Sequence, residues 1–323
     1  MKYLKSDLFY YILFFIISIL IYLNNFNHYF LSDDFNGVYK FGNYTISQII
    51  DDFSNFNVLL YRPFITLFNK LNFVLLGDNP LYWNITNILL NFINTVLVFI
   101  ILNYFFKKNE SFFITVLFLV NFSHPEAVIW MSGRTSLLIT MVFLLSLSFF
   151  LGYRRNGNKL FILISVFIYF IGFFIKENIY IFPFILIFIL IIQKRKNYRI
   201  LIPYFIILLI FILIRIGPLL NNQSSVININ IGFNSIKNLL YIFSGTLIPI
   251  DYAYVQDIYG KYSLLQLFSI YPALYSLILT PMFYLILMFK GKKNALFLIT
   301  LYIICLLYTS DAADDMQCVD LGG

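Results

Sequence analysis

Charge is scarce in this sequence. Asp, Glu, Lys and Arg make up only 11% of the 323 residues, whereas 61% are hydrophobic and the mean hydropathy is +0.84. Several stretches run roughly 15–25 residues with almost no charge, which is the length that crosses a bilayer as a helix. This excludes an ordinary water-soluble domain and predicts an all-α, polytopic transmembrane helical bundle. The expected spans, about nine or more, fall at 8–23, 81–106, 111–122, 135–153, 160–175, 178–192, 200–214, 264–289 and 294–304.

Cysteine is almost absent. The two that occur, Cys305 and Cys318, both lie in a final stretch, 305–323, that abandons the apolar pattern and resembles a translated sequencing adaptor. We therefore expect a transmembrane domain over 1–304, whose natural C-terminal continuation is missing, and a non-native tail over 305–323. Because 1–304 holds no cysteine, no disulfide or thiolate metal site is expected there.

Acidic residues are sparse in one set of the segments that connect the predicted spans. Short basic segments carry 14 of the 22 Lys and Arg residues, near 2–5, 107–108, 154–159, 194–199 and 290–293. By the positive-inside rule these face the cytoplasm, so the net charge of +7 indicates topology and not nucleic-acid binding. The connections at 24–80, 123–134, 176–177 and 215–263 then form an outer-face loop and juxtamembrane region. Residues 8–23 read as an uncleaved anchor. The Phe-, Tyr-, Ile-, Asn- and Lys-rich composition favours a bacterium with an AT-rich genome, and we expect the chain in the inner (cytoplasmic) membrane of that host.

The familiar soluble-enzyme motifs are missing: there is no P-loop, GxGxxG, HExxH or nucleophile elbow. Two polar stretches near the start of the outer region stand out instead. LSDDFNGV carries Asp33 and Asp34, a carboxylate pair able to act as a general base or to bind a divalent ion; the alternative is a helix cap or a solvated loop. YRPF carries Arg62, whose planar guanidinium fits phosphate oxygens, or which anchors the chain at the interface.

A richer stretch, SHPEAVIWMSGR, lies between two apolar runs. Pro125 suits the first turn of a helix, and Glu126 there complements the helix dipole, which is a purely structural account of both. If that helix continues, Glu126, Trp130 and Arg134 share one face, as in a polar cleft. His124 adds a further ionisable group, although an isolated histidine here also suits an interfacial position.

A second outer-side group interrupts the apolar stretch from 160 to 192. IKEN places Lys176 and Glu177 at the tip of a tight helical hairpin, either as functional groups or as a solvated turn. Ionisable groups at membrane depth indicate function by default, and all of these lie on the same predicted side. We therefore expect them to converge on one site, with Asp251 as a further outer-side carboxylate.

In order along the chain, the acidic pair, YRPF, NPLYWNITNILLNFINTVLV, SHPEAVIWMSGRTSLL, IKENIYIFPFIL and LIPIDYAYV resemble GT-C glycosyltransferases over about 30–304. The likeness is to bacterial relatives of the tetratricopeptide-associated protein O-mannosyltransferases. It implies an inverting transfer on the outer face from a polyprenyl-phosphate sugar to a hydroxyl of a protein or glycan acceptor. It matches Asp33 and Asp34 to the catalytic acidic motif, and it matches six further residues to substrate- and phosphate-binding positions: Arg62, His124, Glu126, Arg134, Lys176 and Glu177.

Three functions stay open on this reasoning. The first is the glycosyltransferase, with no nucleotide cofactor expected and with a divalent metal left open. The second is a transporter or flippase of a lipid-linked glycan, which would place charged or broken helices near mid-membrane. The third is a membrane scaffold without catalysis, for which the polar groups would serve only stability or partner binding.

Overall fold

The computed structural model describes residues 2–30, 34–58, 60–120, 124–193 and 198–221, all of which belong to one compact unit that spans 1–224. Within these ranges every regular element is helical, so the predicted all-α class is confirmed for them. The spans expected at 264–289 and 294–304, the tail at 305–323 and Asp251 lie outside the described residues.

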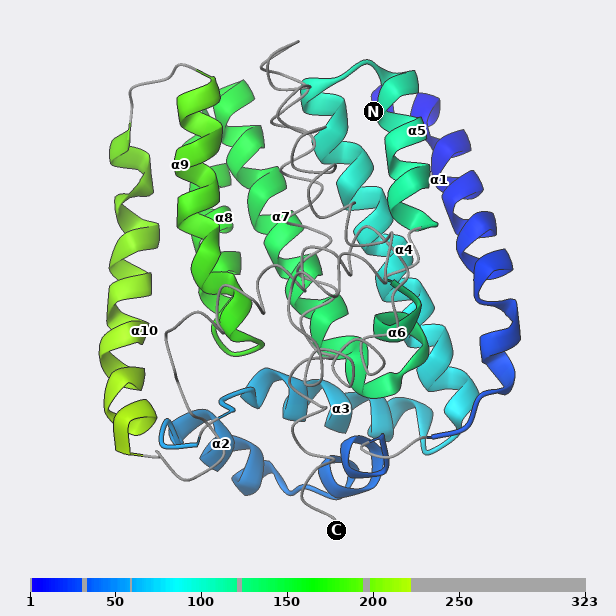
Figure 1. Cartoon of the computed structure of the whole chain (residues 1–323), viewed down its shortest axis with the longest axis vertical. Helices are drawn as coiled ribbons and strands as arrows, with labels where there is room; N and C mark the ends of the chain where they lie inside the picture. The colour runs from blue at the N-terminus through cyan, green and yellow to red at the C-terminus, as the bar shows by residue number, and fades with distance from the viewer. Residues whose placement is uncertain (1, 31–33, 59, 121–123, 194–197, 222–323) are drawn as a thin grey trace, which may run out of the picture. The chain divides into compact units, whose positions relative to one another are not determined.

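The helices follow one another through short connections (Figure 1). Their bounds are α1 Lys2–Ile21, α2 Ile46–Ser54, α3 Pro63–Leu76, α4 Pro80–Phe105, α5 Lys108–Leu119, α6 His124–Ile129, α7 Arg134–Asn156, α8 Lys159–Gly172, α9 Phe182–Ile192 and α10 Ile202–Asn221. Five short turns of 3-10 or π helix join them: η1 Leu23–Asn27, η2 Asn36–Lys40, η3 Met131–Gly133, η4 Glu177–Ile181 and η5 Tyr198–Leu201.

Three of these segments are long and apolar enough to cross a membrane: Pro80–Phe105, Met131–Asn156 and Tyr198–Gly217. Four shorter apolar helices accompany them, at Asp7–Ile21, Pro63–Leu76, Lys159–Gly172 and Glu177–Ile191. The three long segments agree with predicted spans and indicate an integral membrane protein. The described residues show these three candidates and not the nine or more spans that the sequence predicted.

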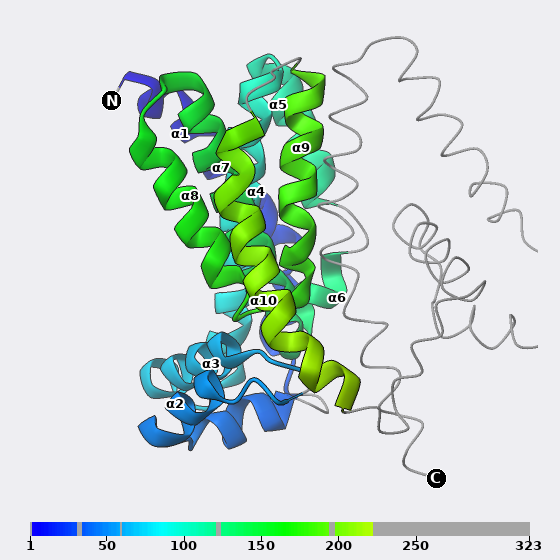
Figure 2. The same cartoon turned by 90° about the vertical axis from the view of Figure 1, so that its left-hand side faces the viewer.

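The long helices run roughly side by side, and the connections at their two ends differ (Figure 1). At one end lie the turns between α4 and α5 and between α7 and α8, which the sequence assigns to the basic side. Lys108 there pairs with Asp7, and Arg154 donates to Gln193 Oε1 over 3.4 Å. At the opposite end lie α2, α3 and α6, with α2 and α3 crossing the bundle (Figures 1 and 2).

The core of the unit is built around α7, which packs on both α4 and α8. A buried polar network ties α7 to α8 and α10: Ser146 Oγ donates to Ser165 O over 2.9 Å, and Tyr204 Oη donates to Ser165 Oγ over 2.7 Å. Hydrogen bonds of this kind hold helices together where lipid removes the usual hydrophobic drive for association.

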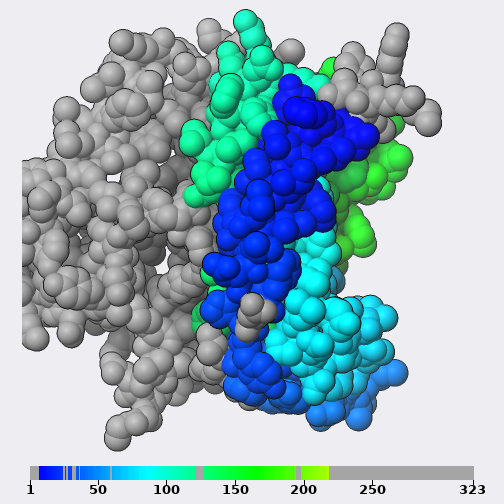
Figure 3. Space-filling model, turned by 90° about the vertical axis from the view of Figure 1, so that its right-hand side faces the viewer, coloured from blue at the N-terminus to red at the C-terminus, as the bar shows by residue number. Residues whose placement is uncertain are grey.

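On the flank, α1 lies across α4 and α5 (Figure 3). Phe14 is fully buried and meets Phe99 and Phe112, with ring centroids 5.3 and 5.7 Å away. Leu8 and Phe9 on the same helix are exposed. This one-sided packing of an apolar helix suits a helix that contacts the bundle on one face and lipid on the other.

The polarity of α3 is reversed relative to a helix on a water-soluble protein. Thr66, Asn69 and Asn72 are buried, and their spacing of three places them on one face. Val74 and Leu75 on the same helix are exposed. Since buried polar groups need hydrogen-bond partners, we expect the polar face of α3 to bind other polar side chains of the unit.

Candidate functional site

The chain between α6 and α7 breaks its helix. The sequence predicted one helix continuing from Pro125 to Arg134, but α6 ends at Ile129, Trp130 is extended (φ −77°, ψ 125°), and α7 begins at Arg134. The prediction that Glu126, Trp130 and Arg134 share one helix face is therefore wrong. Arg134 is instead the first residue of a new helix, directly after the break.

Two features of the sequence explain this break. Asn87 of α4 donates its Nδ2 to the carbonyl oxygens of Val128 (3.2 Å) and Trp130 (3.4 Å), which supplies hydrogen bonds to backbone that leaves the helix. A Cβ on Gly133 would lie 2.8 Å from Ala127 O and 2.9 Å from Ala127 Cα, so only glycine allows the turn to fold back this closely.

Asp34 is anchored in this break. Its side chain is buried, at 2% exposure, and its Oδ1 accepts from Ser132 N over 2.9 Å and from Ser132 Oγ over 3.0 Å. The two residues are 98 positions apart in the chain. The structure therefore joins the acidic motif to the SGR motif through Asp34 and Ser132.

Arg134 lies near enough to Asp34 for their charges to interact, since Asp34 binds Ser132 and Arg134 binds Met131 of the same turn. The guanidinium is 1% exposed, donates from Nε to Met131 O over 3.0 Å and from Nη1 to Asn69 Oδ1 over 3.3 Å, and lies 4.3 Å from the Trp83 ring centroid. Among the described residues Nη2 has no hydrogen-bond partner. We call Asp34, Asn69, Ser132 and Arg134 the inner cluster. It holds a cation and a carboxylate in a buried setting, where their interaction is strong.

A second group lies at the start of α3. Arg62 Nη2 is 3.6 Å from Glu177 Oε2, and the two side chains are 20% and 40% exposed. The backbone joins the same elements, because Phe64 N donates to Phe174 O over 3.0 Å. We call Arg62 and Glu177 the outer pair. Both side chains are partly exposed, whereas Nε and Nη2 of the guanidinium are themselves buried.

Lys176 precedes Glu177 but differs from it in burial. Its side chain is only 2% exposed, and its backbone N donates to Gly172 O over 3.2 Å in the turn after α8. A short turn and η4 separate α8 from α9 here, as expected, but α8 packs on α7 and α10. A solvated turn does not describe Lys176, since a buried ammonium carries a desolvation cost that exposed lysines avoid.

Helix α3 connects the two groups. Arg62 is its N-cap residue and Asn69 follows seven positions later, so they lie about 10 Å apart along the helix axis at 1.5 Å per residue. Asn69 belongs to the inner cluster through Arg134. The polar face of α3 thus runs from the outer pair towards the inner cluster.

Some predicted site residues cannot be compared in this way. Asp33 lies outside the described residues. His124 and Glu126 lie in α6 by their backbone, and only their helical positions are described. Within the described ranges no group of three or more His, Cys, Asp or Glu side chains gathers as a metal site would require.

The sequence reasoning missed a stripe of asparagines on α4. Asn84, Asn87, Asn91 and Asn94 are all buried, and their spacing of three, four and three places them on one helix face. Asn84 Nδ2 donates to His28 O over 3.1 Å, and Asn94 Nδ2 donates to Leu137 O over 3.0 Å. The signal was present in NITNILLNFINT, where asparagine recurs with a helical period inside an apolar run.

Arg215 was also missed as a candidate. It lies in the apolar helix α10 and is 4% exposed. Its Nη1 donates to Val58 O over 2.7 Å, which links α10 to the connection between α2 and α3. In the sequence it was predicted only to be the first residue of the outer segment 215–263.

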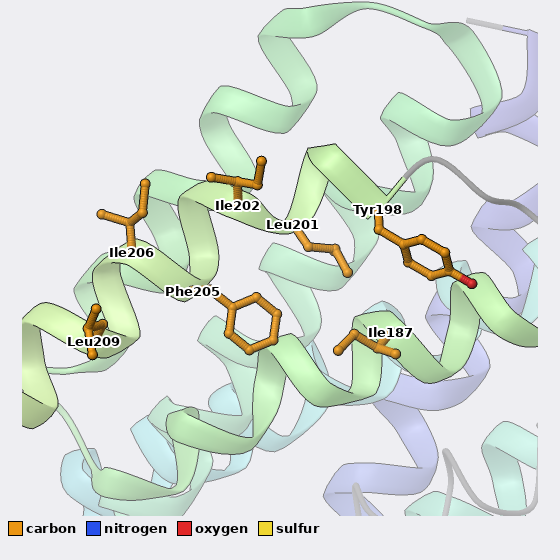
Figure 4. A pocket seen from close by; sticks show the side chains of 7 residues that line it. All are labelled: Ile187, Tyr198, Leu201, Ile202, Phe205, Ile206 and Leu209. Atoms are coloured by element: carbon orange, nitrogen blue, oxygen red, sulfur yellow. The ribbon is translucent and has the colours of Figure 1, made fainter.

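A separate groove of about 450 Å³ follows α9, η5 and α10 (Figure 4). It is lined by Ile187, Tyr198, Leu201, Ile202, Phe205, Ile206 and Leu209. This lining is almost wholly apolar and includes no residue of the inner cluster or the outer pair. It offers a surface for hydrocarbon and no chemistry.

Comparison with known proteins gives a partial likeness. The chain is 39% identical over 101 residues to human "Protein O-mannosyl-transferase TMTC1", which is 31% of this chain and 11% of that protein. It is 37% identical over 101 residues to the mouse protein of the same name, of which it covers 10%. The chain thus spans about a tenth of the length of these curated relatives. No family model and no solved structure matches it. The similarity to membrane glycosyltransferases of this kind is therefore distant and covers part of the chain.

Proposed function

We propose that the chain is an integral-membrane glycosyltransferase of the GT-C type. It transfers a sugar from a polyprenyl-phosphate donor to a hydroxyl of a protein or glycan acceptor on the extracytoplasmic face. The transfer inverts the configuration at the anomeric carbon. The observation that carries the proposal is the inner cluster, in which the acidic motif is bound by Ser132 beside a buried arginine. Two supports accompany it: the likeness to O-mannosyl-transferases, and the location of the cluster at the end opposite the basic connections.

The two aspartates take different roles in this proposal. Oδ1 of Asp34 already accepts two hydrogen bonds from Ser132, and its side chain is buried, which suits a residue that fixes the acidic loop. We assign the general base to its neighbour Asp33. As the base takes the proton of the acceptor hydroxyl, the oxygen bonds to the anomeric carbon, and the sugar–phosphate bond breaks with its electron pair going to the phosphate.

The leaving phosphate needs cations. The side chain of Arg62 is partly exposed, and a phosphate that replaces Glu177 at its guanidinium gains a charge-assisted hydrogen bond. Lys176 adds positive charge and is the sequence neighbour of Glu177. Arg134 is held in the interior by Met131 and Asn69, so we assign it to supporting Asp34 and not to the phosphate. His124 and Glu126, on α6, are assigned to substrate binding.

The test measures release of free polyprenyl phosphate from a labelled polyprenyl-phosphate hexose. The sample is membranes from cells that express the natural full-length gene. Asp33→Asn is expected to lower turnover by about 10²–10⁴-fold, the usual contribution of a general base. Asp34→Asn is expected to lower it less and also to lower the amount of folded protein. Asp51→Asn is the matched control, because it lies in a second Asp-Asp pair, on α2, where its side chain is exposed.

Unchanged release by a folded Asp33→Asn/Asp34→Asn variant contradicts the proposal. Movement of the intact lipid-linked sugar across the membrane, with no chemical change, would assign the chain to transport instead.

A further inference from the structure

Arg215 is a charged side chain buried within an apolar helix. It lies in the last part of α10, within the candidate span Tyr198–Gly217, and is 4% exposed. Ionisable groups at this depth are costly, and they are generally kept for a specific interaction. In Figure 2 this end of α10 reaches the level of α2 and α3.

The interaction is with the connection between α2 and α3. Arg215 Nη1 donates to the carbonyl oxygens of Phe56 and Val58, the latter over 2.7 Å, and its guanidinium carbon lies 5.4 Å from the Tyr61 ring centroid. These partners are more than 150 positions away in the chain. One side chain thus binds both the backbone and the aromatic ring of this connection.

Tyr61 makes the connection a single packed unit. Its hydroxyl donates to Phe53 O over 2.7 Å, and its ring lies 4.8 Å from that of Phe56, centroid to centroid. The next residue is Arg62, which begins α3 and forms the outer pair with Glu177. Any shift of Tyr61 therefore moves the backbone that carries the Arg62 guanidinium.

We infer that Arg215 is a positioning residue that holds Arg62 in place for the phosphate of the lipid-linked donor. It acts through the carbonyls of Phe56 and Val58 and through the ring of Tyr61. The inference rests on the proposed function, because it takes Arg62 as the phosphate-binding arginine. It adds α10 to the elements that build the site. It also gives the two arginines different roles, because Arg215 orients the site and Arg62 touches the substrate.

The test compares Arg215→Met, which keeps the length of the side chain without its charge, with Arg215→Lys, which keeps a donor for the two carbonyls. Arg199→Met is the control, because Arg199 is an exposed arginine in η5, at the other end of this helical segment. Donor KM and kcat are measured on folded, purified full-length protein. Amide hydrogen exchange of the peptide 53–62 is measured on the same samples.

Arg215→Met is expected to raise donor KM by about tenfold, the scale of one charge-assisted hydrogen bond, with kcat changed less than about twofold. Exchange of the peptide 53–62 should rise, Arg215→Lys should restore part of both effects, and Arg199→Met should change neither. If Arg215→Met does not fold, Tyr61→Leu keeps Arg215 but removes the ring that it contacts, together with the hydroxyl bond to Phe53 O, and is expected to shift KM in the same direction.

Three results decide the matter. Wild-type KM and exchange in folded Arg215→Met would overturn the inference. Faster exchange with an unchanged KM would also overturn it, since Arg215 would then serve stability only. If wild-type protein turns over no donor while Arg215→Met still speeds amide hydrogen exchange of the peptide 53–62, Arg215 does hold the connection between α2 and α3. In that case it is the proposed function that fails.

Discussion

Replacing Asp34 by asparagine separates the charge of the inner cluster from its hydrogen bonds. The amide keeps an oxygen that can accept from Ser132 N and Oγ, but it removes the negative charge next to Arg134. Removing one member of a buried charge pair typically costs about 3–5 kcal/mol, and the lower end applies here because Arg134 keeps its hydrogen bonds to Met131 O and Asn69 Oδ1. We therefore expect Asp34→Asn to lower the free energy of unfolding by about 3 kcal/mol.

A double-mutant cycle with Arg134→Met tests this reason for the loss. Methionine removes the charge at Arg134, so Asp34→Asn should cost less in that background, with a coupling free energy of about 1–3 kcal/mol. Unfolding is followed by denaturant titration in mixed micelles. Asp78→Asn, on an exposed aspartate, is the control and should stay within about 0.5 kcal/mol of wild type. Additive losses in the cycle would refute electrostatic coupling inside the cluster.

Three further substitutions test the packing around the site. Gly133→Ala places a Cβ against the backbone of Ala127 and should lower the free energy of unfolding by about 1–3 kcal/mol, so wild-type stability would contradict the close approach of η3 and α6. Asn94→Leu removes the donor to Leu137 O and should cost about 0.5–2 kcal/mol; a gain in stability would show that packing outweighs the hydrogen bond. Ser165→Ala removes the hydroxyl that joins α7, α8 and α10 and should lower the thermal midpoint in detergent, while Ser148→Ala, on an α7 serine whose hydroxyl donates to Leu145 O of the same helix, should not.

The helical elements were largely predictable because their signal is local. Uninterrupted apolar runs predicted the candidate spans at Pro80–Phe105, Met131–Asn156 and Tyr198–Gly217, each within a few residues of an expected boundary. The basic connections predicted which ends of the helices lie together, and Figure 1 bears this out for the turns after α4 and α7. Length and charge suffice for these conclusions.

The break at Trp130 was not predictable from the same signals. Its residues are compatible with a helix, and what ends the helix is the side chain of Asn87, some forty positions earlier. The burial of Arg134 likewise depends on Trp83 and Asn69 from two other helices. Single residues indicated that this region is polar, but only the packing shows which of them face solvent and which support another residue.

Irregular backbone inside an apolar bundle is stable only where other groups satisfy its hydrogen bonds. Asn87, in the asparagine stripe of α4, meets that need at the carbonyl oxygens of Val128 and Trp130. Asn69, on the polar face of α3, accepts a hydrogen bond from the side chain of Arg134 directly after the break. The same polar groups therefore allow the break between α6 and α7 to exist and give it a fixed shape. Because Ser132 lies in that break and binds Asp34, the shape of the break determines where the acidic motif lies. The asparagines are then as much a part of the proposed site as the charged residues, although none of them needs to touch a substrate.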